Sequence, residues 1–229
     1  MLTDAPPQKN RAESLESDCV KSLDVPQDGT LLEIAKRLDS AMKSDRIADV
    51  RSACAEFLAT ASDFYRVPTC GIRVLAARPV RVREQWTTEL FGDYSPETML
   101  IRVWMRTAVR KEVTSFGALL STLCHEFCHH LDYQKFGFHD SWHTRGFYER
   151  AAVLYHHARA TPLKKLFWVP RQADVGESTS SGRIGVLEVS LLENHSTLAN
   201  HSGSTPTCGE SRFLRCRNPY PRIAAAVIG

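Results

Sequence analysis

The chain has 229 residues, 43% of them hydrophobic, so it can bury one good hydrophobic core. Its formal net charge of +3 does not by itself indicate a nucleic-acid-binding protein. Its seven cysteines are an odd number without framework spacing, which favours reduced thiols in the cytoplasm over a secreted disulfide scaffold. The polar start of the chain and the lack of an apolar run of about 18 residues argue against a secretory signal and a membrane span.

The first third of the chain is predicted to hold a loose segment followed by two helices. Residues 1–29 lack the apolar periodicity that supports ordering, so we expect a disordered tail there. Thr30 and Glu33 form a capping-box pattern at the start of a helix, with apolar residues at helical spacing behind it. A second helical pattern begins at Ile47 and ends before Pro68, which blocks its continuation. We expect both helices to be scaffold.

A small sheet is predicted between residues 71 and 108. Apolar and charged residues alternate over 71–82, which indicates one interrupted strand or two short ones. Residues 91–97 carry Gly, Asp, Ser and Pro, the usual chemistry of a turn. Residues 98–108 alternate cleanly, which predicts a half-buried strand. Two roles are open for this strand: an interior strand, or an edge that holds a peptide substrate as an added strand.

Basic residues outnumber acidic ones across the predicted strands. They are Arg66, Arg73, Arg78, Arg81, Arg83, Arg102, Arg106, Arg110 and Lys111. Such a concentration fits a face for nucleic acid or for an acidic substrate, and it equally fits the charged surface of a solvated sheet. Both interpretations stay open at this point.

Two further helices are predicted, over residues 115–133 and 143–161, with Pro162 closing the second. Beyond them the composition becomes rich in Ser, Thr, Asn and Gly, so residues 173–229 are predicted to form a disordered, low-complexity tail. Together these elements predict an α+β domain over residues 30–172.

The first of these two helices contains the HExxH motif HEFCH. Two imidazoles at positions i and i+4 of a helix lie one turn apart, close enough to bind a single ion. On a helical wheel the apolar residues form one stripe, and His125 and His129 lie on the side turned away from it. A histidine that only packs would lie within or beside that stripe. The arrangement therefore indicates part of a metal site, with a packed helix as the alternative.

A catalytic zinc ion usually takes three protein ligands and leaves one position for water, so a third ligand is required. The metzincin pattern is excluded, because Lys135 stands where its histidine belongs. His143 and Glu149 follow at compatible distances, and His139 and Asp140 compete with them. A wheel of the second helix places His143 on the packing face, provided that the helix already includes it, and turns Glu149 to solvent. His143 is the preferred ligand, and the others stay open.

HEFCHHLD followed by HTRGF resembles the SprT-like zinc metallopeptidases, relatives of the minimal gluzincin fold. The spacing from histidine to aromatic residue is kept, while the glycine is displaced by two places. The resemblance covers residues 65–160 and implies a small sheet beside the active-site helix. It also implies Zn²⁺ bound by His125, His129 and His143, Glu126 as the general base, and a protein or peptide substrate whose peptide bonds are hydrolysed.

Several neighbours of the motif have predicted roles. Asp132 lies beside both motif histidines on the wheel, where it either orients a ligand by accepting its second ring proton or caps the helix end. His130 lies at the edge of the apolar stripe and is expected to be structural. Zinc would acidify its bound water, and Glu126 would take the proton. The alternative function is a non-catalytic metal-binding or nucleic-acid-associated module with the same fold.

Overall fold

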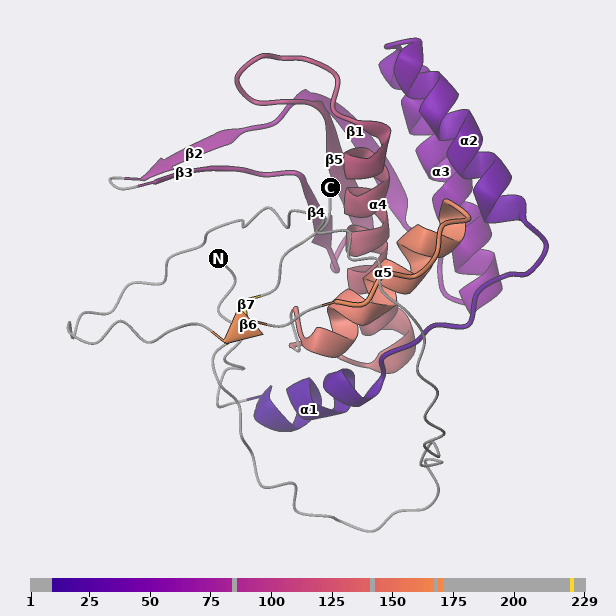
Figure 1. Ribbon diagram of the computed structural model, residues 1–229, viewed down its shortest axis with the longest axis vertical. Helices are drawn as coiled ribbons and strands as arrows, with labels where there is room; N and C mark the ends of the chain where they lie inside the picture. Colours follow the sequence, from indigo (N-terminus) through magenta and orange to yellow (C-terminus); the bar gives the residue numbers. More distant parts are fainter. Residues whose placement is uncertain (1–9, 84–85, 141–142, 167–168, 171–222, 225–229) are drawn as a thin grey trace, which may run out of the picture.

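The computed structural model describes residues 10–83, 86–140, 143–166, 169–170 and 223–224 (Figure 1). Within these residues the chain has the predicted α+β architecture, with helices packed beside a small sheet. The α-helices are α1 (Arg11–Cys19), α2 (Thr30–Lys43), α3 (Ile47–Tyr65), α4 (Phe116–Leu131) and α5 (Arg145–Ala158), and the short π-helix η2 (Asp132–Phe136) follows α4. The motif helix, α4, contacts both the sheet and α5. Among the described helices, none combines the length and the apolar character that a membrane crossing requires.

Three strands form the main sheet, in the order β1 (Gly71–Ala77), β5 (Leu100–Arg106) and β4 (Gly92–Ser95). β1 runs parallel to the central strand β5, and β4 runs antiparallel to it, with Tyr94 opposite Ile101. Ile101, Val103 and Met105 of β5 are fully buried. Alternate residues of the central strand therefore face the helices and belong to the core.

The sheet differs from the sequence prediction in two places. Residues 91–97 carry turn chemistry, but Gly92–Ser95 form β4, because pairing with β5 supplies hydrogen bonds that local propensity does not reveal. The predicted strand 98–108 is β5, shortened to Leu100–Arg106, and it is the central strand. The hypothesis that this strand holds a substrate along its edge is therefore wrong, since β4 covers it on one side and β1 on the other.

Most of the predicted C-terminal tail, residues 173–229, lies outside the described residues. The part that is described, β7 (Ile223–Ala224), pairs antiparallel with β6 (Val169–Pro170). Another antiparallel pair, β2 (Val80–Arg83) with β3 (Trp86–Glu89), extends away from the helices in Figure 1. Neither pair contributes to the site described below.

The two predicted scaffold helices form, but the first is capped differently. α2 begins at Thr30, and α3 ends at Tyr65, before Pro68. The N-cap of α2 is Gly29, with φ 74°, and the Asp28 carboxylate accepts a hydrogen bond from the Thr30 N–H at 2.9 Å. The apolar faces of α2 and α3 join the sheet, α4 and α5 in one buried cluster.

The N-terminal segment is not a loose tail over its whole length. Residues 1–9 lie outside the described residues, but Arg11–Cys19 form α1, which packs on α5 (Figure 1). α1 has no apolar stripe, and the residues that it buries are Ser14 and Ser17. Polar contacts to α5, and not a buried apolar face, order this helix. Its sequence therefore lacks the hydrophobic periodicity from which a helix is predicted.

Several basic side chains of the strand region form ion pairs. These pairs are Arg102 with Asp93, Arg106 with Asp45, and Arg78 with Glu89. Arg102 and Asp93 lie opposite each other on β5 and β4. The acidic partners neutralise part of the positive charge, so this region is less basic than its arginine content suggests.

Candidate metal centre

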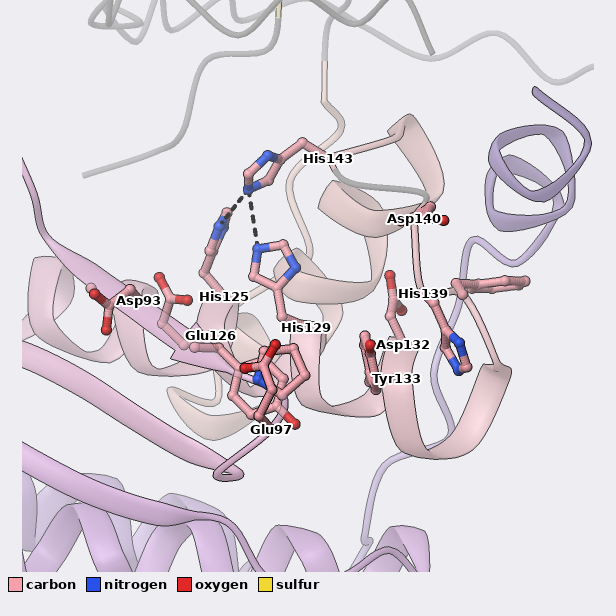
Figure 2. Close-up of a pocket in the computed structure, with 14 residues that line it drawn as sticks. Asp93, Glu97, His125, Glu126, His129, Asp132, Tyr133, His139, Asp140 and His143 are labelled. Atoms are coloured by element: carbon pink, nitrogen blue, oxygen red, sulfur yellow. Dashed lines mark hydrogen bonds between the residues drawn. The ribbon is translucent and has the colours of Figure 1, made fainter. Parts of the chain in front are cut away.

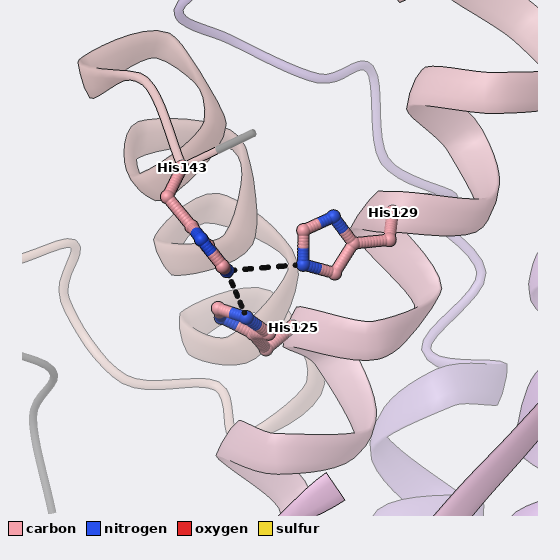
Figure 3. A group of neighbouring side chains, drawn as sticks. All are labelled: His125, His129 and His143. Atoms are coloured by element: carbon pink, nitrogen blue, oxygen red, sulfur yellow. Dashed lines mark hydrogen bonds between the residues drawn. The ribbon is translucent and has the colours of Figure 1, made fainter. Parts of the chain in front are cut away.

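Three histidine side chains, two from α4 and one from the segment before α5, converge on one point (Figure 3). The Nε2 atom of His143 lies 3.0 Å from Nε2 of His125 and 3.1 Å from Nε2 of His129. The ligand atoms of the three residues all lie within 4.8 Å of one another. The structure thus brings together the three preferred residues in a group that can hold a metal ion.

The geometry and the hydrogen-bonding capacity of this group both fit a metal ion. Two nitrogens that bind one tetrahedral ion at roughly 2.0–2.1 Å lie about 3.3 Å apart, close to the 3.0 and 3.1 Å separations observed. The Nε2 atom of His143 carries at most one hydrogen, so it cannot donate to both neighbouring nitrogens. A cation shared by three lone pairs satisfies all three nitrogens together.

Burial keeps the three imidazoles neutral. Removal from water, together with the nearby charge of His143, lowers the pKa of His125 to about 3, and burial lowers the pKa of His143 to about 4. The pKa of His129 is held well below its ordinary value by burial and then by repulsion from the other two. Because the neutral imidazole is the form that binds a metal, the group needs no deprotonation at neutral pH.

The helical wheel places His143 within the second helix. In the structure, His143 lies outside that helix. It precedes the N-cap, Thr144, and α5 begins at Arg145. The backbone of His143 has φ 55°, in the left-handed region that residues other than glycine rarely adopt. The Thr144 hydroxyl accepts a hydrogen bond from the Phe147 N–H at 3.1 Å, which starts the helix directly after His143. A constrained helix entry, rather than a helix face, presents the third histidine of the group.

Phe147, the aromatic residue of HTRGF, packs against all three imidazoles. Its ring centroid lies 4.4 Å from that of His129 in a stacked arrangement. It lies 4.8 Å from the His125 centroid and 5.3 Å from the His143 centroid, with the rings edge to face. Phe147 is fully buried, so it is a rigid surface that restricts the orientations available to the three imidazole rings.

Glu126 lines a cavity of about 500 Å³ that the three histidines also line (Figure 2). Its side chain is buried, and this burial, together with the charge of Asp93, raises the pKa of Glu126 to about 8. A Cβ added at Gly92 would lie 2.9 Å from Glu126 Oε1 and 2.5 Å from Thr122 Cγ2. Gly92 therefore permits β4 to approach the motif helix, a role that could be seen only once β4 was known to be a strand.

The other candidate ligands lie outside the histidine group. His139 and Asp140 line the same cavity, and the His139 ring is stacked on Tyr133 with centroids 4.4 Å apart. Glu149 lies on α5 and contributes no atom to the group. Among the described residues, the three-histidine group is the one cluster of this kind.

Asp132 and His130 make structural contacts. Both oxygens of Asp132 accept hydrogen bonds from the buried guanidinium of Arg150, at 2.8 and 2.9 Å, so the carboxylate is bound to α5 rather than to a ligand ring. His130 Nε2 lies 2.7 Å from the Pro68 carbonyl oxygen, which can only accept, so Nε2 carries the hydrogen. His130 Nδ1 then accepts from the Tyr94 hydroxyl at 2.9 Å. The structural role predicted for His130 is confirmed.

Comparison with known proteins does not assign this site. No family model, curated protein or solved structure matches the chain. The resemblance to SprT-like metallopeptidases stays a prediction from two histidine motifs. The function must therefore be inferred from the chemistry of the site.

The buried Glu126 carboxyl gives the metal-free protein a testable pH dependence. Because its pKa is about 8 rather than the ordinary 4.5, the folded protein keeps a proton that the unfolded chain releases. The carboxyl therefore costs stability, and this cost grows as the pH rises from 4.5 towards 8. We expect Glu126→Gln to stabilise the metal-free protein by about 2–4 kcal/mol near pH 7.5, with no gain near pH 4. Urea denaturation of the wild type and of Glu126→Gln at both pH values measures the difference in stability. Equal stability of the two proteins near pH 7.5 contradicts the prediction.

Proposed function

We propose that this chain is a zinc-dependent metallopeptidase of the SprT-like type, which hydrolyses peptide bonds in a protein or peptide substrate. The observation that supports this proposal is the convergence of three neutral imidazoles beside the Glu126 carboxyl in one cavity. A set of three protein ligands with one open position is typical of catalytic zinc sites, whereas structural sites use four.

Zinc is the ion that the donor set favours. Imidazole nitrogen suits zinc and several other transition metals, whereas magnesium, calcium and manganese prefer oxygen ligands. Histidines at i and i+4 beside a glutamate are the pattern used by zinc metalloproteases. Cys124 and Cys128 flank the motif histidines, but both are buried in the core and neither belongs to the group. The site therefore offers nitrogen donors without thiolate.

The residues of the cavity have distinct roles in the proposed reaction. When bound, zinc would supply an acidified water, with a pKa of about 7, and polarise the scissile carbonyl. The positive charge of a bound zinc ion would favour the ionised form of Glu126, whose carboxylate would then accept a proton as the water attacks and return it to the departing amine. A carboxyl whose pKa is raised by burial is well suited to holding that proton between the two steps. Phe147 keeps the ligand rings oriented.

The outer edge of β4 offers a binding place for an extended substrate. Within the described part of the chain β4 is the outer strand on its side of the sheet. Gly92, Asp93 and Tyr94 of this strand line the cavity together with Glu126. An extended peptide can add to such an edge through backbone hydrogen bonds, which do not depend on its sequence. We infer that β4, and not β5, aligns the substrate.

A cleavage assay tests the proposed function. The purified full chain, loaded with one equivalent of zinc, is incubated with an unfolded protein such as casein, and new fragments are identified by mass spectrometry. A zinc chelator is expected to abolish cleavage, and added zinc to restore it. Stoichiometric zinc binding without cleavage would contradict the enzyme and support the non-catalytic metal-binding module instead.

Gly92→Ala is expected to slow hydrolysis by about 10- to 100-fold while zinc binding is retained, because moving a reacting group away from its productive position has effects of this order. The nearest atoms to the added methyl group belong to Thr122 and Glu126, so the carboxyl must move. Gly71→Ala is the matched control in β1, because its Cβ meets nothing closer than Leu100 Cδ1 at 3.2 Å. Hydrolysis rate and zinc affinity are measured for both variants. A wild-type rate for Gly92→Ala contradicts the assigned position of Glu126.

A further inference from the structure

The C-terminal end of α1 lies directly against the start of α5. The N–H of Gly146 donates a hydrogen bond to Asp18 Oδ1 at 3.1 Å. A Cβ at Gly146 would lie 2.0 Å from the Ser17 carbonyl oxygen and 3.0 Å from that of Val20. No side chain larger than hydrogen fits between the two backbones, so Gly146 decides whether α1 can dock.

Arg150 completes this contact from within the protein. Its side chain is 0% exposed, and its Nη1 donates to the carbonyl oxygens of Ser17, at 3.0 Å, and Val20. These carbonyls lie at the C-terminal end of α1, where helix carbonyls lack partners within the helix. Its Nη2 donates to Ser17 Oγ at 3.1 Å and to both oxygens of Asp132. One buried arginine therefore ties α1 to α5 and to the end of the motif helix.

The hydroxyl groups of Ser17 and Thr144 link α1 to the residue that follows His143, the proposed third ligand. Ser17 Oγ lies 2.7 Å from Thr144 Oγ1, which also accepts the Phe147 N–H. Either hydroxyl can donate this hydrogen bond, because each oxygen accepts one other hydrogen bond, from Arg150 and from the Phe147 N–H, and keeps a second lone pair. Thr144 follows His143, whose φ of 55° is a strained conformation that persists only where its surroundings hold it.

We propose that α1 is a clamp that positions His143 for metal binding, with Ser17, Gly146 and Arg150 as positioning residues. This inference rests on the proposed metal centre and extends it, because α1 lies outside the region that resembles the metallopeptidases. Without the clamp, Thr144 loses its hydroxyl partner and the strained His143 relaxes, which leaves the two imidazoles of α4. If α1 acts in this way, the N-terminal helix is part of the metal site.

Gly146→Ala tests the clamp, because it blocks docking of α1 without altering a ligand. Alanine favours helix more than glycine does, so α5 itself is not weakened. We expect the zinc affinity of the full chain, measured by competition with a chromophoric chelator, to fall about 10- to 100-fold, as when a partner that orients a ligand is removed. Gly117→Ala in α4 is the matched control, because its Cβ meets the side-chain ends of Tyr155 and Arg159 at 3.2 and 3.4 Å. The control should bind zinc like the wild type.

Gly146→Ala in a His143→Ala background distinguishes an effect on the position of His143 from a general disturbance of the fold. If the clamp acts through His143, Gly146→Ala has no further effect on the residual zinc affinity of that background. An equal loss in both backgrounds overturns the proposal, because the effect then does not pass through the ligand. An affinity within about twofold of the wild type in the single variant also overturns it.

Ser17→Ala is a milder change, and it decides the question if Gly146→Ala does not fold. It removes the hydroxyl link to Thr144 and is expected to weaken zinc binding, whereas Ser14→Ala, buried on the same helix, leaves it unchanged. Wild-type affinity in Ser17→Ala overturns the clamp. A wild-type chain that binds no zinc refutes the metal centre and the clamp together. Wild-type zinc binding with unaffected variants refutes the clamp alone.

Discussion

Glu126→Gln is expected to reduce the rate of peptide hydrolysis by about 100- to 10,000-fold without releasing zinc. Glutamine has nearly the same shape as glutamate, but it cannot accept the proton of the attacking water. Glu126 lines the cavity without belonging to the histidine group, so the ligand set is unchanged by this substitution. The rate at saturating substrate and the zinc content are measured on the same samples.

Glu149→Gln is the matched control for this experiment. Glu149 is a carboxylate on α5 outside the histidine group, so its variant should keep the wild-type rate and zinc content. Wild-type hydrolysis by Glu126→Gln would show that another group accepts the proton. Loss of zinc from Glu126→Gln would instead identify Glu126 as a ligand, contrary to the proposed mechanism.

His143→Ala is expected to lower the zinc affinity by more than about 100-fold and to abolish detectable hydrolysis. Removing a partner that only orients a ligand already costs about 10- to 100-fold, so removing the ligand itself should cost more. The variant keeps two imidazoles on α4, which can still hold zinc weakly. Competition with a chromophoric chelator measures the affinity.

His139→Ala provides the contrast to His143→Ala. His139 lines the same cavity, but it lies outside the histidine group, so its loss should leave the zinc affinity unchanged. If His139→Ala weakened zinc binding and His143→Ala did not, the third ligand would be wrongly assigned.

The proximity of the two motif histidines and Glu126 could be predicted from sequence because their relation is local. His125, Glu126 and His129 belong to one helix, whose period places the two imidazoles together on the side away from the apolar stripe. His143 joins the two motif histidines in one group, as predicted, but the reason that the wheel gave was incomplete. The wheel assumed that it lies in α5, whereas it precedes the N-cap with a positive φ.

Features that depend on contacts between distant parts of the chain could not be predicted. β4 forms from residues with turn chemistry because β5 pairs with them, and no local pattern reveals that pairing. α1 is ordered by Arg150 and Gly146, which follow it by more than a hundred residues and carry no signal in the N-terminal sequence itself. The cost of burying Arg150 is offset by Asp132 and by the carbonyls of α1, an arrangement that only the folded chain displays.

The X-ray absorption spectrum of the zinc-loaded full chain tests the account most directly. We expect one zinc ion per chain, bound by three imidazole nitrogens at about 2.0–2.1 Å with one further light atom. The spectrum of His143→Ala should show two imidazoles. Sulfur ligands, fewer than three imidazoles in the wild type, or the absence of stoichiometric zinc would contradict the proposed metal centre.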